Sequence, residues 1–439
     1  MKRIASLSRL SLILACASLF VMPVTAAAQA RTVPIKSVGP NVPAEIPGTV
    51  YRQRRLRLMQ ELGGCAAAIR SYSTTDYLGQ VRFDPYFFYL TGIKKKGAML
   101  LLSPKAAIAK QVLYMPPRDL EAERWTGYAE ILSKSFRTKY RVDGARRTRS
   151  RVPPGLGSAL RKSRCYAKLR PAFANKPGVP SRMLSKYVSS YSARTTQRWE
   201  KLEYLRTIKD AAEIKRHEKA IAITAEGHRA AARWLAPGLT ERKLASKIED
   251  AFYAYGATSL AFPSIVGSGP KGAILHWLKR TKVIQKSELV VVDIGAAYGG
   301  YAADITRTYP VSGTFSAKQR RVYNIVLATQ KKIIAAVKPG VTLERLNQIA
   351  SAELAKAGYT LKHFFGHFVG LQVHDVGDRT APLEAGMIIT VEPGIYLKGQ
   401  FGVRIEDMVL VTPRGNRLLT GALPRTAAAV EAWMKKARR

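Results

Sequence analysis

The sequence predicts an α/β protein of two domains, in which a smaller α/β domain precedes a larger domain of mixed helices and strands. The chain has 439 residues, of which 47% are hydrophobic, enough for two or three domains with real cores. Helical patterns alternate with short apolar runs up to about residue 190, whereas glycine-rich turns separate strand runs after residue 260. Ordinary glycine and proline usage excludes a disordered or collagen-like chain.

The expected elements are justified in chain order. Residues 31–46 contain three prolines and are expected to form an extended lead-in to an N-terminal domain over residues 47–195. That domain should hold a helix over 51–67, whose apolar residues share one face, and strands over 98–102 and 111–115. The C-terminal domain, residues 203–430, should hold helices over 203–234, 239–260, 318–337 and 343–356, and strands over 288–295, 301–311, 387–391 and 404–411.

Residues 1–30 are expected to be a signal peptide rather than part of the fold. Basic residues open the segment, residues 10–24 are apolar, and Ala28-Gln29-Ala30 fits a signal-peptidase cleavage site. The apolar stretch is too short for a comfortable membrane span. Export to the periplasm or out of the cell is therefore predicted, with a lipid anchor at Cys16 and an uncleaved N-terminal anchor as alternatives.

Two cysteines, Cys65 and Cys165, remain after the predicted cleavage. An exported chain with two cysteines can form one disulfide, but a single bridge does not make a disulfide scaffold. Neither cysteine lies beside a histidine or within a CxxC pair. Buried thiols are the favoured interpretation, and a disulfide is the alternative.

Charge is the unusual feature of the composition. The 72 Lys and Arg residues exceed the 30 Asp and Glu residues by 42, and residues 1–202 carry +27 of this excess (37 − 10). Residues 134–198 hold 18 basic residues and one acid, Asp143. A basic region attracts polyanions in a salt-dependent way, but this one carries no nucleic-acid motif. A solvated basic face is the favoured interpretation, and weak docking to an anionic surface is the alternative.

Acids are scarce, so two acid pairs in apolar surroundings are informative. Asp293 follows the buried-strand run Val290-Val291-Val292, and Tyr298-Gly299-Gly300 has turn chemistry. If the turn is centred between Tyr298 and Gly299, Asp293 faces Asp304 on the neighbouring strand, with Cβ atoms about 4.5–5.5 Å apart. Facing carboxylates destabilise a sheet unless a positive charge lies between them.

The second pair follows the same logic. Glu392 and Glu406 flank a turn centred on Gly399, with strand-like residues on both sides. Two apolar hairpins that each hold a facing acid pair indicate a site for cations. The alternative is that one acid of each pair faces solvent or a basic neighbour such as Arg404 or Arg307.

Histidines favour the metal interpretation. Six occur in the chain, and four fall between residues 276 and 374, namely His276, His363, His367 and His374. A lone histidine among apolar neighbours is more often a core residue, and for His363 that alternative stays open. Four carboxylates and one imidazole form an oxygen-rich set suited to two divalent ions, with Mn²⁺ favoured over Co²⁺, Zn²⁺ or Fe²⁺. Two such ions can share a hydroxide and bind both oxygens of a hydrolytic transition state.

These residues resemble the pita-bread metallopeptidases, most closely the Xaa-Pro aminopeptidases (aminopeptidase P) and their prolidase relatives. The resemblance covers roughly residues 47–430. Its motifs are RFDPYFFYLTG (82–92), PSIVGSGPKGAILHW (263–277), VVDIGAAYGGYAADITRTYPVSG (291–313), GHFVGLQVHDVG (366–377), TVEPGIYL (390–397) and GVRIEDMVLVT (402–412). It implies a creatinase-like α/β N-terminal domain of the aminopeptidase P type and a C-terminal pita-bread catalytic domain.

The resemblance also implies a set of metal ligands. Asp293 would bind one metal ion, and His367 together with Glu392 would hold the other. Asp304 and Glu406 would bridge the two ions. The expected cofactors are therefore two divalent metal ions, with Mn²⁺ favoured.

Catalytic and substrate-binding roles follow from the same resemblance. Glu392 would accept a proton from the metal-bound water, while His276 and His374 would stabilise the tetrahedral intermediate and assist departure of the proline nitrogen. Arg404 would orient the substrate or its neighbouring carboxylate, and His363 is placed with it in the substrate-binding set. This chain departs from relatives by the aromatics Phe364 and Phe365, which are expected to reshape the pocket.

The predicted function is hydrolysis of the N-terminal Xaa-Pro bond of peptides by a metal-bridged hydroxide. A prolidase that cleaves only Xaa-Pro dipeptides is the first alternative. A pita-bread module without metal that binds peptide, protein or polyanion is the second. The expected partners are a peptide with proline at its second position and other copies of the chain, as a homodimer or homotetramer implied by the resemblance. No nucleic acid is expected, and weak docking to anionic surfaces would involve residues 134–198.

Overall fold

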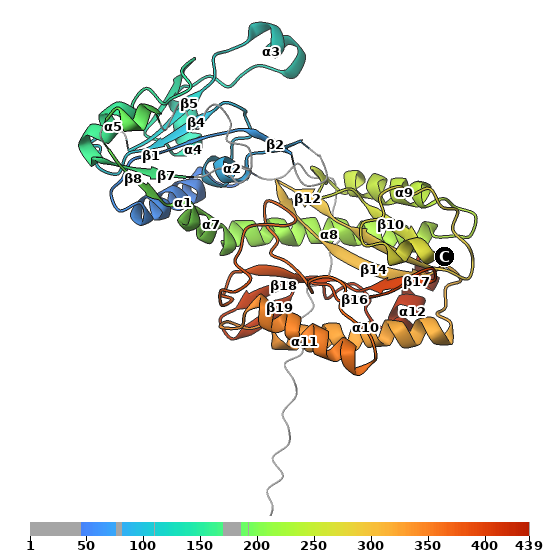
Figure 1. Cartoon of the computed structure of the whole chain (residues 1–439). Coiled ribbons are helices and arrows are strands. Elements are labelled where there is room, and N and C mark those ends of the chain that lie inside the picture. Colours follow the sequence, from blue (N-terminus) through green and yellow to red (C-terminus); the bar gives the residue numbers. More distant parts are fainter. Residues whose placement is uncertain (1–44, 76–80, 109, 170–185, 192, 439) are drawn as a thin grey trace, which may run out of the picture. The chain divides into compact units, whose positions relative to one another are not determined.

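Figure 1 shows the computed structural model, which describes residues 45–75, 81–108, 110–169, 186–191 and 193–438. The predicted signal peptide and most of the predicted lead-in lie outside the described residues. Among the helices that are described, none is long and apolar enough to cross a membrane.

The N-terminal elements are short helices and strands, in chain order α1 (Gly48–Glu61), β1 (Ala67–Arg70), β2 (Ser73–Thr75), β3 (Val81–Phe83), α2 (Pro85–Thr91), β4 (Met99–Leu102), β5 (Gln111–Met115), α3 (Leu120–Thr126), α4 (Lys134–Tyr140), β6 (Gly144–Arg147), α5 (Leu156–Ser163), β7 (Cys165–Lys168) and β8 (Arg194–Gln197). A sheet in the order β1-β4-β5-β6 forms their centre. Leu100 of β4 packs with Leu58 of α1 and Phe87 of α2 on one face, and Leu101 packs with Leu160 of α5 on the other. Alternating side chains of one strand thus fill two apolar layers.

Two of the predicted N-terminal strands are confirmed, and one predicted helix is too long. β4 and β5 match the strands expected over 98–102 and 111–115. The helix expected over 51–67 ends at Glu61, because Gly63 and Gly64 adopt φ values of 58° and 80°. This left-handed backbone ends the helix, and the chain then enters β1.

Cys65 and Cys165 form a disulfide, which corrects the favoured expectation of two thiols. Their Cα atoms lie 4.8 Å apart because the segment before β1 runs beside β7. There the Ala66 N–H donates to the Cys165 carbonyl over 3.1 Å. The two cysteines are 100 residues apart in sequence, so only the pairing of these strands brings them together.

Reduction of this disulfide is expected to lower the free energy of unfolding by about 2–4 kcal/mol, because the bridge restricts the unfolded chain over a long loop. Urea unfolding with and without a reductant measures the effect. Cys65→Ser/Cys165→Ser is the control, and its stability should not respond to the reductant. Free thiols at both positions in unreduced peptide mapping would contradict the bridge.

The C-terminal elements are α7 (Trp199–Thr207), α8 (Ala211–Trp234), α9 (Glu241–Ala254), β9 (Ser259–Leu260), β10 (Ile265–Ser268), η1 (Gly269–Ala273), β11 (Leu289–Ile294), β12 (Ala296–Tyr298), β13 (Tyr301–Ala302), β14 (Ile305–Pro310), α10 (Ala317–Ala336), α11 (Leu343–Lys356), β15 (Ile388–Val391), β16 (Gly394–Leu397), β17 (Phe401–Arg404), β18 (Asp407–Thr412), β19 (Gly415–Leu418) and α12 (Ala427–Ala437). In Figure 1, α8 and α9 lie on one side of the strands, and α10 and α11 lie on the other. The helix expected over 203–234 is two helices, because Asp210 caps a new one by accepting from the backbone N–H groups of Ala212 and Glu213.

Two strands that were expected to be continuous are each broken. The run over 301–311 divides into β13 and β14, and the run over 404–411 divides between β17 and β18. Each hairpin therefore bends, so that β11 and β14 pair in one sheet and β12 and β13 in another. The same arrangement recurs in the second hairpin, where β15 pairs with β18 and β16 with β17.

The register predicted for the first hairpin is wrong, and that of the second is confirmed. Asp293 pairs with Thr306 rather than Asp304, because the turn is centred on Gly299 and Gly300. Both glycines have positive φ, 59° and 95°, as a two-residue hairpin turn requires. In the second hairpin, the pairs on either side of the bend keep the register that sets Glu392 opposite Glu406.

Candidate metal centre

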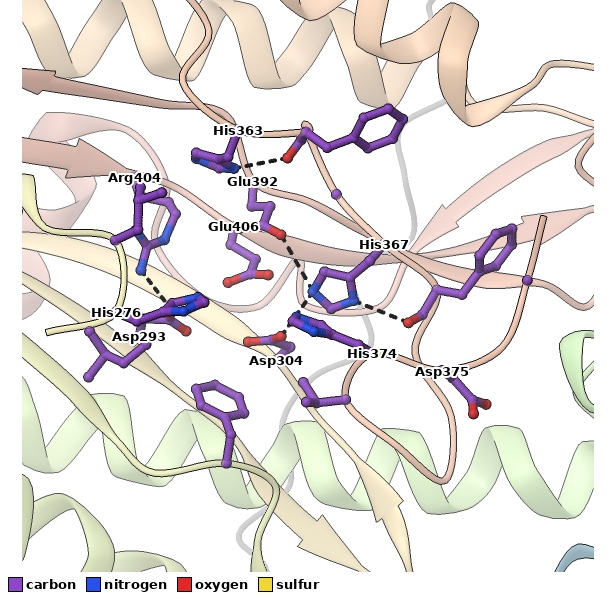
Figure 2. A pocket seen from close by; sticks show the side chains of 18 of the residues that line it. His276, Asp293, Asp304, His363, His367, His374, Asp375, Glu392, Arg404 and Glu406 are labelled. Carbon is purple, nitrogen blue, oxygen red and sulfur yellow. Dashed lines mark hydrogen bonds and ion pairs between the residues drawn. The ribbon is translucent and has the colours of Figure 1, made fainter. Parts of the chain in front are cut away.

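Four carboxylates lie where one strand ends and the next begins. Asp293 comes at the end of β11, and Asp304 lies in the break between β13 and β14. Glu392 directly follows β15, and Glu406 lies in the break between β17 and β18. Because the strands bend at these points, all four side chains reach one cavity (Figure 2). The first pair meets there even though its two residues are not paired in register.

The cavity has a volume of about 350 Å³. All nine residues that the sequence assigns to the site line it, namely His276, Asp293, Asp304, His363, His367, His374, Glu392, Arg404 and Glu406. Apolar side chains such as Phe262, Ile265 and Val373 complete the wall. The structure therefore brings the predicted set together, while the role of each residue stays a prediction.

His367 enters the site from the segment between α11 and β15. Its backbone N–H donates to Thr390 Oγ1 over 2.9 Å, and its Nδ1 lies 3.1 Å from the Phe368 carbonyl. Because a carbonyl only accepts, Nδ1 carries a proton in this contact and Nε2 is turned toward the carboxylates. Nε2 lies 3.4 Å from both Asp304 Oδ2 and Glu392 Oε1. This is the orientation of an imidazole metal ligand that is held by its other nitrogen.

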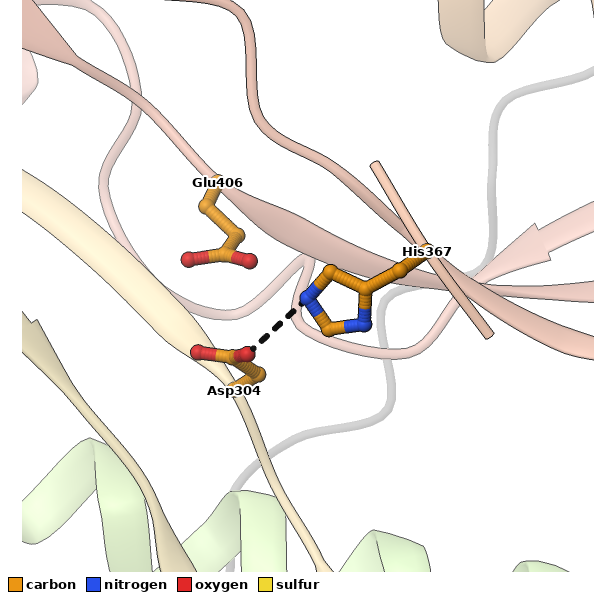
Figure 3. A group of neighbouring side chains, drawn as sticks. All are labelled: Asp304, His367 and Glu406. Atoms are coloured by element: carbon orange, nitrogen blue, oxygen red, sulfur yellow. Dashed lines mark ion pairs between the residues drawn. The ribbon is translucent and has the colours of Figure 1, made fainter. Parts of the chain in front are cut away.

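The donor set fits a divalent metal. Asp304, His367 and Glu406 present ligand atoms within 4.8 Å of one another (Figure 3). Burial and the nearby Asp293 carboxylate raise the pKa of Asp304 well above its usual range. Burial and the nearby Asp304 and Glu392 carboxylates likewise raise the pKa of Glu406. Asp293 Oδ1 and Glu406 Oε1 are buried without a hydrogen-bond partner among the described residues. A cation here would supply that partner and favour the ionised carboxylates.

Arg404 holds one side of the acid cluster. Its Nη2 donates to Asp293 Oδ2 over 2.6 Å, and its Nε donates to Thr306 Oγ1 over 3.2 Å. Thr306 in turn donates to Glu406 Oε2 over 2.7 Å. Arg404 therefore orients Asp293 directly and Glu406 through Thr306. The roles expected of Arg404 in the site stay predictions.

Two further histidines, His276 and His374, line the cavity in the neutral form at ordinary pH. Desolvation by the walls of the cavity lowers the pKa of His374 to about 3 and also lowers that of His276. The His374 ring packs edge-on against His367, with ring centroids 4.2 Å apart. A neutral imidazole does not repel a metal ion next to it and can donate a hydrogen bond.

His363 is tied into a hydrogen-bonded chain. Its Nδ1 donates to the Phe364 carbonyl over 2.9 Å, so Nε2 accepts from the Tyr396 hydroxyl over 2.8 Å. The Tyr396 oxygen also accepts from Arg404 Nη1 over 3.0 Å. Burial lowers the pKa of His363 to about 4, which keeps the ring neutral. Both ring nitrogens have partners, so in this structure His363 holds Tyr396 in place.

Only one of the two aromatics expected at the pocket reaches it. Phe364 lines the cavity, with the Arg379 guanidinium 4.4 Å from its ring centroid. The expectation that Phe365 shapes the pocket is wrong, because its side chain is fully buried in the core. Gly366 between Phe365 and His367 is required, since a Cβ there would lie 2.1 Å from the Thr390 carbonyl oxygen.

Sequence reasoning missed the side chains that hold the site residues in place. Thr306, Thr390 and Tyr396 each bond a predicted site residue. Asp375, next to His374, pairs with the buried Arg206. All but Arg206 lie in motifs already quoted from the sequence, but their residue types alone do not distinguish them from ordinary strand and loop residues.

The bent double-hairpin fold and its buried carboxylate–imidazole cluster define a metallopeptidase of the pita-bread class. Residues 215–413 match the model of metallopeptidase family M24, and residues 51–163 match the aminopeptidase P N-terminal domain. The Xaa-Pro aminopeptidase of Haemophilus influenzae is 31% identical over 89% of this chain and 98% of its own length. The chain belongs to metallopeptidase family M24, in the aminopeptidase P group.

Other comparisons agree with this membership. The Xaa-Pro dipeptidase of Pyrococcus horikoshii is 42% identical, but over 49% of this chain and 63% of its own length. The aminopeptidase P structure from Escherichia coli in its low-pH form has a TM-score of 0.79 at 28% identity, covering 90% of this chain and all of that chain. Pseudomonas aeruginosa aminopeptidase PepP has a TM-score of 0.78 at 28% identity, covering 90% of this chain and 99% of that chain. The predicted fold class is confirmed, and membership implies metal-dependent hydrolysis.

Proposed function

We propose that the chain is an Xaa-Pro aminopeptidase, which removes the first residue of a peptide whose second residue is proline. The observation that carries this proposal is the convergence of four carboxylates and His367 in one cavity with neutral histidines. The full-length similarity to the Xaa-Pro aminopeptidase of Haemophilus influenzae supports the substrate class. The bond to proline is a tertiary amide without an N–H, so its cleavage calls for a dedicated pocket.

The proposed cofactors are two divalent metal ions, with Mn²⁺ as the preferred metal. The residues that would hold them are Asp293, Asp304, His367, Glu392 and Glu406. Carboxylate oxygens with a single imidazole favour Mn²⁺ over softer metals. When bound, such a pair lowers the pKa of water, so that a hydroxide nucleophile is available near neutral pH.

Glu392 is proposed to take the proton of the attacking water. Its contacts in the described chain are long: 3.4 Å to Thr390 Oγ1 and 3.4 Å to His367 Nε2. Asp293, by contrast, is bound by Arg404 over 2.6 Å. The Glu392 carboxylate is therefore held beside the reaction centre while keeping an oxygen free to receive a proton.

His276 and His374 are proposed to act on the peptide itself. Both line the cavity, and partial desolvation there lowers their pKa values, which keeps both rings neutral near pH 7. A neutral ring can donate to the oxyanion that forms during attack, or deliver a proton to the departing proline nitrogen. Arg404 and Tyr396 would keep the acid cluster in position meanwhile.

The central test compares an Xaa-Pro dipeptide with the matching Xaa-Pro-Yaa tripeptide in the presence of Mn²⁺. We expect cleavage of the tripeptide after its first residue, measured by release of the free amino acid. A peptide with alanine in place of proline is the specificity control, and a chelator should stop the reaction. Cleavage of the dipeptide alone would assign the chain as a prolidase. No metal-dependent cleavage of either peptide would favour the binding-module alternative.

We also propose domain boundaries, an oligomeric state and a location for the chain. We propose domains over 47–195 and 203–430, and the matched ranges 51–163 and 215–413 lie inside them.

A homodimer or homotetramer is supported by exposed apolar side chains, with Trp125 85% exposed. Export is supported by the signal-like N-terminal sequence and by the Cys65–Cys165 disulfide. Light scattering of the purified protein and cell fractionation test the last two.

A further inference from the structure

Among the described residues of 144–199, the exposed cations form no ion pair, unlike many cations of the C-terminal domain. In the C-terminal domain, Arg229 pairs with Glu226 over 3.0 Å, and Arg320 pairs with Glu431 over 2.5 Å. Residues 144–199, by contrast, contain 14 Lys and Arg residues and no Asp or Glu. This segment therefore has no acid of its own to neutralise its charge.

Six of these cations lie on two consecutive elements and their connection, and we call them the basic layer: Arg146, Arg149, Arg151, Arg161, Lys162 and Arg164. The first lies on β6, the next two in the connection that follows it, and the last three at the C-terminal end of α5. All six are exposed, and none forms an ion pair with another described residue. The layer is thus a concentration of unneutralised positive charge.

Packing explains why these side chains face solvent. α5 buries Leu156, Ala159 and Leu160 against the sheet, so its charged residues lie on the other side. β6 is an edge strand beside β5. Cations near a helix C-terminus are stabilised by the helix dipole, which accounts for those on α5. It does not account for the three on β6 and its connection.

We propose that the basic layer docks the protein on an anionic lipid bilayer. Clusters of Lys and Arg are attracted to anionic lipid headgroups, and this attraction is screened beyond a Debye length. No large hydrophobic side chain among the described residues of 144–199 is exposed. The contact is therefore electrostatic, without insertion into the membrane, and sensitive to salt.

A bilayer fits the basic layer better than nucleic acid does. Single-stranded nucleic acid is usually bound by exposed aromatic side chains that stack on bases. Tyr191, whose ring centroid lies 5.5 Å from the Arg161 guanidinium, and Tyr187 are half-buried, with hydroxyls 3.1 Å apart. The predicted export signal also favours lipid headgroups as the polyanion that the protein meets. This inference does not depend on the proposed peptidase activity.

Vesicle co-sedimentation of the full chain tests the proposal. Vesicles of phosphatidylglycerol and phosphatidylcholine are compared with phosphatidylcholine alone, at about 50 mM and about 500 mM NaCl. The test variant replaces four layer residues with glutamine: Arg149, Arg151, Arg161 and Lys162. A control variant makes the same change in net charge at four exposed lysines of the C-terminal domain: Lys243, Lys286, Lys331 and Lys338.

We expect binding to the anionic vesicles at low salt only, weakened about tenfold or more in the test variant and little changed in the control. Peptidase activity on a soluble peptide should be the same in both variants. An equal loss in the two variants would mean that net charge alone drives binding. Equal binding to phosphatidylcholine would mean an apolar contact, and tighter binding to a DNA fragment would reassign the partner. Each of these results overturns the proposal.

Discussion

Asp304→Ala is expected to lower kcat/KM for an Xaa-Pro-Yaa peptide by roughly 1000-fold or more, equal to about 4 kcal/mol of transition-state stabilisation. Asp304 is one of three residues whose ligand atoms lie within 4.8 Å of one another, and its Oδ2 is 3.4 Å from His367 Nε2. Its side chain is buried, so no other group can replace it as a ligand without movement of the backbone. Bound metal, measured by elemental analysis of the purified protein, should fall together with activity.

The control for this variant is Asp378→Ala, which removes the same carboxylate from an exposed loop residue near the cavity. Asp378 bonds only its local turn, accepting from the Thr380 backbone over 2.8 Å and from its hydroxyl over 2.7 Å. Its activity and metal content should stay close to those of the unchanged chain. Full activity of Asp304→Ala, or metal loss without loss of activity, would remove the metal centre from the proposed function.

The two hairpins show how far a sequence pattern can locate a site. The prediction for Glu392 and Glu406 is right because their turn is symmetric about Gly399. The register for Asp293 and Asp304 is off by two positions, because which glycines of Tyr298-Gly299-Gly300 occupy the turn depends on backbone φ values. The acids still meet, because the strands break at Asp304 and the backbone turns toward the cavity.

Features that depend on long-range packing could not be predicted. The disulfide forms because the Cys65 segment and β7 are neighbours, which nothing in the sequence near either cysteine indicates. The environments of Phe364 and Phe365 could not be predicted either. Although the two residues are adjacent in one loop, Phe364 lines the cavity and Phe365 packs in the core. The motifs predicted which residues line the cavity, whereas packing decided which neighbouring side chains bond to them.

The partners of Arg307 also depend on long-range packing and could not be predicted from the sequence. Substitution of Arg307 has the largest effect on stability that we expect. The sequence suggested Arg404 or Arg307 as basic neighbours of the acid pairs. Arg404 does bind Asp293, but Arg307 binds Asp407 over 2.7 Å, with both side chains fully buried. Arg307 Nη1 also donates to the Glu406 carbonyl over 2.6 Å. It therefore fixes the backbone of a predicted metal ligand.

Arg307→Met is expected to lower the free energy of unfolding by about 3–5 kcal/mol, because it leaves the buried Asp407 carboxylate without its hydrogen-bonded guanidinium partner. Urea unfolding measures this loss. Arg320→Met is the matched control: its ion pair with Glu431 is partly exposed, so it should cost at most about 1 kcal/mol. Of the remaining partners of Asp407, Gln330 Nε2 at 2.9 Å and Thr420 Oγ1 at 2.5 Å are neutral. The other cation, Arg425, lies farther away, with its Nε 3.9 Å from Asp407 Oδ2.

A double variant, Arg307→Met/Asp407→Leu, separates the buried charge from the other bonds of Arg307. Removing both charges should recover part of the lost stability, because apolar residues can replace a buried ion pair at little cost. Metal affinity should not recover, because the Glu406 carbonyl still lacks the Arg307 donor that fixes its backbone. Recovery of both stability and metal affinity would mean that the Arg307–Asp407 ion pair stabilises the fold and does not contribute to metal binding. Recovery of neither would mean that the carbonyl bonds of Arg307, rather than its charge, hold this part of the catalytic domain.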